Sequence, residues 1–162
     1  MKRLVDIIIA LIALLLLSPI FLIVSYKVRK NLGSPIFFCQ ERPGQNGKLF
    51  KMIKFRSMKD IFDADGKLLP DEKRITPFGH KLRATTLDEM PQLINVLKGE
   101  MSIVGPRPQL PEFLEHYTKE QMRRHDVKPG LTGFAQINGR NELSWDDKFF
   151  YDVQYPKNQI GR

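Results

Sequence analysis

The sequence lacks the patterns of several common functional classes. Cys39 is the only cysteine, so an internal disulfide is excluded and a reducing compartment is expected. No internal repeat is visible, and no aromatic-studded glycine strand or recognition helix accompanies the basic residues, so nucleic acid is not an expected partner. His80 has no second His or Cys at metal-ligand spacing, which argues against a zinc motif.

Acidic residues are also relatively few. Asp and Glu number 18 against 26 Lys and Arg, which gives a formal net charge of +8. This excess suits an anionic partner such as anionic lipid or a phosphorylated substrate. A hydrophobic content of 42% and a charged content of 27% exclude disorder as the main state, and 162 residues suffice for one core.

The longest apolar run is Ile7 to Tyr26, which contains no charged residue. At about 1.5 Å per residue, a helix of this length would just cross a hydrocarbon layer of roughly 30 Å. A signal peptide fits poorly, because the run exceeds the usual length of about 7–15 residues and no small-residue cleavage site follows it.

Two features of this run favour a re-entrant helix over a simple span. Ser18-Pro19 lies inside it, and proline removes a backbone donor, so a kink or break is expected there. Both flanks are basic, and positive charge tends to stay on the cytoplasmic side. A re-entrant helix keeps both flanks on that face; a kinked bitopic span and a buried soluble helix remain as alternatives. The flanking cations are Lys2, Arg3, Lys27, Arg29 and Lys30.

The chain beyond this run predicts a small α+β domain that is mostly helical. Ile36–Gln40 and Leu49–Phe55 read as two strands of a short β-hairpin, with Asn46-Gly47 as its tight turn. The second strand is basic. Lys54 and Arg56 either attract anionic headgroups or contact a substrate phosphate, and Arg56 is the better candidate for an inward-facing cation.

An adjacent carboxylate pair, Asp88 and Glu89, follows Arg83 and precedes an amphipathic run. Thr86-Leu-Asp-Glu89 has the pattern of a capping box, which would give Glu89 a purely structural role, although Pro91 implies that the backbone is strained or that the helix begins later. Adjacent carboxylates point in different directions on a helix, which does not suit glycoside hydrolysis.

The pair suits phosphoryl chemistry instead. One carboxylate can attack phosphorus while the other helps to hold a metal or manage protons. Mg²⁺ is commonly held by one or two carboxylates together with substrate oxygens, so Asp88 and Glu89 are candidate ligands. Arg83, Arg107 and Arg140 could bind phosphate oxygens by bidentate hydrogen bonds, with Arg107 held between two prolines.

Several motifs, in one order along nearly the whole chain, resemble those of the bacterial monotopic phosphoglycosyl transferases, the initiating sugar transferases of glycan assembly. These motifs are Ser18-Pro19, Lys54–Met58, Leu87–Leu93, Asn95–Gly99, Met101–Pro108 and Lys128–Arg140.

The resemblance implies transfer of a sugar-1-phosphate from a UDP-sugar to a polyprenyl phosphate, with release of UMP. It implies the cytoplasmic face of the bacterial inner membrane, a re-entrant helix broken at Ser18-Pro19 over residues 1–31, and a catalytic domain over residues 32–162. Besides these substrates, the expected partners are membrane lipid and, as a further possibility, a second copy of this chain in a homo-oligomer.

The resemblance also assigns roles. Asp88 resembles the nucleophile of a ping-pong reaction that forms a phosphoglycosyl-aspartate, and Glu89 its partner at Mg²⁺ or in proton handling. Arg107 resembles a contact to the phosphate or uridine, with Arg83 and Arg140 as further contacts.

The sequence departs from the family pattern in two places. Phe134 stands where the family usually has Trp, and family members usually continue beyond the Asn158 region, so a C-terminally truncated domain is an expectation. The rival interpretation is a non-catalytic membrane-surface scaffold that binds anionic lipid and uses Asp88 and Glu89 only at a helix end.

Overall fold

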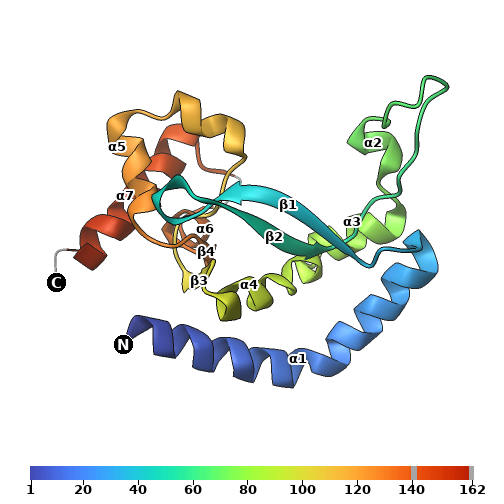
Figure 1. Ribbon diagram of the computed structural model, residues 1–162, viewed down its shortest axis with the longest axis horizontal. Helices are drawn as coiled ribbons and strands as arrows, with labels where there is room; N and C mark the ends of the chain where they lie inside the picture. Colours follow the sequence, from blue (N-terminus) through green and yellow to red (C-terminus); the bar gives the residue numbers. More distant parts are fainter. Residues whose placement is uncertain (140–141, 161–162) are drawn as a thin grey trace. The chain divides into compact units, whose positions relative to one another are not determined.

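The computed structural model describes residues 1–139 and 142–160 (Figure 1). The chain groups into two compact units. One comprises Met1–Ala13, Gln40–Met52 and the described part of Gln92–Arg162, and the other comprises Leu14–Cys39 and Ile53–Pro91. The elements in chain order are α1 (Lys2–Leu32), β1 (Phe37–Pro43), η1 (Gln45–Gly47), β2 (Leu49–Phe55), α2 (Asp71–Arg74), α3 (Pro77–Ala84), η2 (Leu87–Glu89), α4 (Gln92–Lys98), β3 (Ser102–Val104), η3 (Pro111–His116), α5 (Lys119–Met122), η4 (Arg123–Asp126), β4 (Gly130–Thr132), α6 (Phe134–Ile137) and α7 (Trp145–Ile160), where η denotes a 3-10 helix.

Helix α1 remains helical through Pro19, so of the expected kink or break the helix shows no break. Pro19 has no N–H to donate to the carbonyl of Leu15, four residues earlier. The hydroxyl of Ser18 donates to this carbonyl at 2.8 Å instead. Pro19 therefore removes one backbone donor, and the neighbouring Ser18 hydroxyl replaces it.

Most of α1 exposes apolar side chains. Only 11% of the most apolar 18-residue stretch of α1 is buried. Among the described residues, α1 is the one helix long and apolar enough to cross a membrane. Large exposed apolar patches mark contact surfaces, and here the length and composition indicate membrane association. The prediction of a long apolar N-terminal helix is confirmed.

The predicted β-hairpin is also confirmed. Strands β1 and β2 pair in a two-stranded sheet. Asn46 and Gly47 have φ angles of 56° and 72°, the left-handed conformation that a tight hairpin turn needs. The Gly44 N–H donates to the Lys48 carbonyl at 2.8 Å and closes the turn.

In the unit that contains Leu14–Cys39 and Ile53–Pro91, the C-terminal half of α1 packs on β2 and α3. Val24, Val28 and Leu32 form a helical stripe that meets Phe55 and Leu82. Leu87 and Met90 pack against the same core. Because these two side chains flank the carboxylate pair in the sequence, the core fixes the backbone that carries Asp88 and Glu89.

The other unit holds a second, parallel pair of strands that sequence patterns did not predict. β3 pairs with β4, with Ser102 opposite Gly130 and Val104 opposite Thr132. Nearby, Arg124 and Asp152 form an ion pair that is almost completely buried, and the Tyr117 hydroxyl accepts a hydrogen bond from Arg124 at 2.8 Å. Burial raises the pKa of Asp152 to about 6 although Arg124 opposes the shift.

Candidate active site

The carboxylate pair lies in the short 3-10 helix η2 rather than at the start of an α-helix. The capping-box prediction is wrong, because the Thr86 side chain makes no cap hydrogen bond. The Glu89 N–H instead donates to the Thr86 carbonyl at 3.1 Å. Helix α4 begins only at Gln92, after Pro91, so the later start that Pro91 implied is what the chain adopts.

Thr86 occupies the left-handed region, with φ of 60° and ψ of 10°. A β-branched residue rarely adopts this conformation, which costs about 1–2 kcal/mol in an L-residue. The strained residue lies two positions before Asp88, in keeping with the tendency of backbone strain to occur at functional sites.

We expect Thr86→Gly to stabilise the protein by about 0.5–1 kcal/mol, because the relieved strain exceeds the added entropy of the unfolded chain. Thr85→Gly is the matched control. Thr85 has a right-handed conformation, and its hydroxyl donates to the Lys81 carbonyl at 3.0 Å, so its loss should destabilise by about 1–2 kcal/mol. Thermal unfolding measures both, and shifts of the same sign would contradict the strain.

Asp88 is a buried carboxylate, 7% exposed. Burial raises the pKa of Asp88 above its usual value, and the neighbouring charge of Glu89 adds to the increase. The charges of Lys54 and Arg83, together with a backbone hydrogen bond, act in the opposite direction. A desolvated carboxylate between cations is a stronger nucleophile than one covered by water, and these cations favour its ionised, attacking form.

Glu89 forms an ion pair with Lys54, with 2.8 Å between Oε1 and Nζ. The two side chains are 13% and 20% exposed, so the pair is largely withdrawn from water. Lys54 comes from the end of β2, and its ammonium thus faces the carboxylate pair. This contact distinguishes Lys54 from the exposed lysine Lys51 on the same strand.

Arg83 reaches the site from the last turn of α3. Its side chain is exposed, and its Nε donates to the Ser57 hydroxyl at 2.9 Å. Gly79 permits this approach, since a Cβ there would lie 1.9 Å from the Ser57 carbonyl oxygen. Sequence reasoning missed Ser57 and Gly79. A glycine inside a helix was the available signal, because such a glycine often marks close packing.

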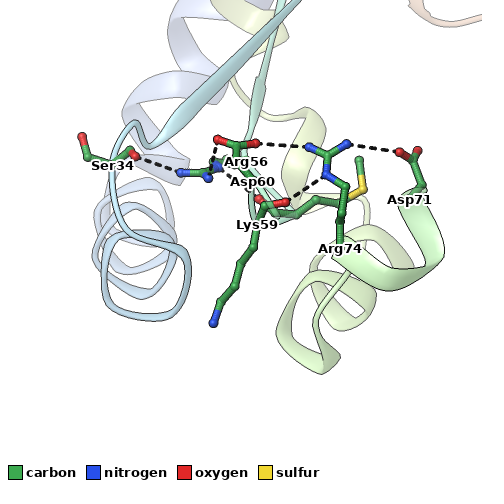
Figure 2. A network of polar contacts seen from close by, with 7 residues as sticks. Ser34, Arg56, Lys59, Asp60, Asp71 and Arg74 are labelled. Atoms are coloured by element: carbon green, nitrogen blue, oxygen red, sulfur yellow. Dashed lines mark hydrogen bonds and ion pairs between the residues drawn. The ribbon is translucent and has the colours of Figure 1, made fainter. Parts of the chain in front are cut away.

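Arg56 points into a network of protein acceptors, which Figure 2 shows. Its guanidinium donates to the Ser34 carbonyl at 2.9 Å, to the Met58 carbonyl at 3.0 Å and to the Asp60 carboxylate at 2.8 Å. Arg74 contacts the same carboxylate at 3.2 Å. These contacts give Arg56 a structural role, while its contact with substrate stays a prediction.

The remaining predicted arginines lie elsewhere in the chain. Arg107 belongs to the unit that contains Gln92–Arg162, where its side chain is exposed and its carbonyl accepts a hydrogen bond from Arg124 at 2.6 Å. Arg140 lies outside the described residues. The structure thus brings Lys54, Arg83, Asp88 and Glu89 together in one unit, and it describes Arg107 within the other.

The donor set at the carboxylate pair fits Mg²⁺ of the kind that bridges to substrate phosphates. Among the described residues, no group of three or more His, Cys, Asp or Glu side chains could form a protein-only metal cage. Mg²⁺ commonly takes only one or two carboxylates and completes its shell with water and phosphate oxygens. Asp88 and Glu89 supply such hard oxygen donors.

The fold and site define a mostly helical, membrane-associated protein with a buried carboxylate pair beside cations. Residues 1–160 of the chain match the bacterial sugar transferase family. The chain is 53% identical over 158 residues to the uncharacterized sugar transferase EpsL of Bacillus subtilis (strain 168), covering 98% of this chain and 78% of that protein.

Other relatives have more specific names. The exopolysaccharide production protein ExoY of Sinorhizobium fredii is 40% identical over 174 residues, covering 97% of this chain and 77% of that one. A UDP-glucose:undecaprenyl-phosphate glucose-1-phosphate transferase of Klebsiella pneumoniae is 44% identical over 161 residues. The match covers 95% of this chain and 34% of that protein. The chain belongs to the bacterial sugar transferase family, and it is a phosphoglycosyl transferase.

Proposed function

We propose that this protein transfers a sugar-1-phosphate from a UDP-sugar to a membrane polyprenyl phosphate and releases UMP, the first membrane step of glycan assembly. The names of its relatives support both substrate classes. The observation that carries the mechanism is the buried Asp88 carboxylate beside the Lys54–Glu89 ion pair.

In the first half-reaction, a carboxylate oxygen of Asp88 attacks the phosphorus that bears the sugar. A phosphorus–oxygen bond to Asp88 forms, the bond to the bridging oxygen breaks, and UMP leaves with the electron pair. The product is a phosphoglycosyl-aspartate. The positive charges of Lys54 and Arg83 favour the ionised form of Asp88 that attacks, and they oppose the effect of its burial on the pKa.

In the second half-reaction, a phosphate oxygen of the polyprenyl phosphate attacks the same phosphorus. The Asp88 carboxylate departs, and a diphosphate joins the sugar to the lipid. Glu89, which pairs with Lys54 at 2.8 Å, would help to hold a metal or accept a proton from the attacking phosphate. Mg²⁺, when bound through Asp88 and Glu89, would neutralise the negative charge of the diphosphate.

The experiment that tests this proposal omits the lipid acceptor. We expect a burst of UMP close to one equivalent per enzyme on mixing with a UDP-sugar, together with a mass increase of the protein equal to one sugar phosphate. A panel of UDP-sugars would identify the preferred donor. A direct, single-displacement reaction predicts no UMP without acceptor, and the scaffold alternative predicts none under any condition.

We also propose that α1 is re-entrant, with residues 1–31 in the inner membrane and the catalytic residues 32–162 on the cytoplasmic face. The basic flanks support this topology, and Pro19 removes one backbone N–H donor inside the apolar run. A membrane-impermeant reagent should fail to label a reactive tag at Met1 in intact cells and should label it after lysis. Labelling in intact cells would support the bitopic alternative.

A further inference from the structure

A cationic cavity lies at the first turn of α1, within the unit that contains Met1–Ala13 and Gln92–Arg162. Its volume is about 240 Å³, and Lys2, Arg3, Lys128, Asp6, Ser102 and Tyr155 are among its lining residues. A water molecule takes about 30 Å³, so a phosphate group fits inside. None of these residues belongs to the predicted catalytic set.

Asp6, the one carboxylate among the described residues that line this cavity, already has hydrogen-bond partners. Asp6 accepts hydrogen bonds from the Ser102 hydroxyl at 2.9 Å and from the Ile103 N–H at 3.1 Å. Lys2 contacts both Asp6 and Ser102, and it donates to the Val104 carbonyl at 3.3 Å. Lys2 and Asp6 therefore neutralise one another and hold the start of α1 on β3.

The other two cations converge above Gly99. A Cβ on Gly99 would lie 3.4 Å from Arg3 Nη2 and 3.6 Å from Lys128 Nζ. Arg3 is occupied by the end of α4, where it donates to the Leu97 carbonyl at 2.8 Å and to the Val96 carbonyl. Lys128 has no acceptor of this kind among the described residues.

Among the described residues Lys128 consequently forms no direct ion pair, and its side chain is partly buried. Burial lowers the pKa of the Lys128 ammonium, and the positive charges of Arg3 and Lys2 lower it further while Asp6 opposes them. Three cations and one paired carboxylate line the cavity. An anion bound there would compensate the excess charge with charge-assisted hydrogen bonds.

The position of the cavity indicates the source of that anion. Exposed apolar side chains of α1 begin next to the residues that line the cavity and continue along the helix. They are Leu4, Val5, Ile8, Ile9, Leu11 and Ile12. A lipid phosphate in the cavity would place its hydrocarbon chains along this face. We propose that Lys128, Arg3 and Lys2 bind the phosphate of a membrane lipid at the start of α1. This inference rests on the proposed membrane seating of α1.

The test is native mass spectrometry of the full chain in detergent with phosphatidylglycerol, phosphatidylcholine or undecaprenyl phosphate. We expect one phosphatidylglycerol to be retained in preference to zwitterionic phosphatidylcholine. Lys128→Ala should weaken retention about tenfold, the effect of one lost charge-assisted hydrogen bond. Lys119→Ala removes the same charge from an exposed site in α5 and should leave retention unchanged.

The source of the phosphate follows from competition. Displacement of phosphatidylglycerol by equimolar undecaprenyl phosphate, in a Lys128-dependent manner, would assign the cavity to the acceptor. Retention of phosphatidylglycerol would assign it to a bilayer headgroup, and both results support the lipid-phosphate site. Equal retention of the two phospholipids, or unchanged retention in Lys128→Ala, would overturn it.

Folding and catalysis are controlled separately. Without lipid, Lys128→Ala should unfold at the same temperature as the wild type or higher, because it removes a partly buried cation that lies beside two other cations. An Asp88→Asn variant should bind lipid normally. Loss of the UMP burst with normal lipid retention therefore separates failure of the enzyme proposal from failure of the lipid site.

Discussion

Asp88→Asn is expected to reduce UMP release from a UDP-sugar by at least about 10³-fold, because the amide cannot form the bond to phosphorus. The substitution keeps the size and shape of a side chain that is 7% exposed, so folding should survive. The mass increase of one sugar phosphate should vanish with the activity. If this variant released UMP at the wild-type rate, the result would contradict the role of Asp88 as the nucleophile.

Asp88→Asn, which should lower activity, is expected to raise the stability of the folded protein. Burial raises the folded-state pKa of Asp88 above the ordinary value that it has in the unfolded chain. Between these two pKa values the native state holds a proton that the unfolded chain releases, so the stability contribution of Asp88 falls as pH rises through this window. Asn carries no such penalty.

We therefore expect Asp88→Asn to unfold at a higher temperature than the wild type at pH 7. The difference should disappear in acid well below the ordinary pKa of aspartate, where Asp88 is protonated in both states. Asp65→Asn is the matched control, because Asp65 lies exposed in the turn before Gly66. Greater stability with lost activity is typical of residues kept for catalysis rather than for folding.

Lys54→Ala is expected to lower kcat/KM about 100-fold at neutral pH, a typical cost for one lost electrostatic contact in an active site. The substitution leaves Glu89 without its 2.8 Å partner in a largely buried position. It also removes the strongest influence that lowers the pKa of Asp88, so this pKa should rise further.

The pH profile distinguishes this role from simple loss of packing. Because Asp88 must be ionised to attack, a higher pKa moves the acidic limb of kcat/KM to higher pH. Lys54→Arg keeps the positive charge and should restore much of the activity and the original limb. Lys51→Ala, on the exposed side of the same strand, should change neither. An unshifted limb in Lys54→Ala would contradict the coupling to Asp88.

Local patterns were sufficient for several elements. The apolar run of α1 and the Asn46-Gly47 turn of the hairpin were both predicted correctly. Each of these depends on neighbours only a few residues apart. The capping box failed at Thr86 although its pattern is equally local, because packing of Leu87 and Met90 on the core overrides the preference of the cap.

The sequence by itself determined the family, the membrane character of α1 and the presence of an adjacent carboxylate pair beside arginines. These properties follow from composition, spacing and motif order. Only the tertiary structure decided which carboxylate is desolvated, which one pairs with Lys54, and that Lys128 forms no direct ion pair among the described residues. Burial and charge pairing depend on segments far apart in the chain, and short-range patterns carry no information about which of them meet.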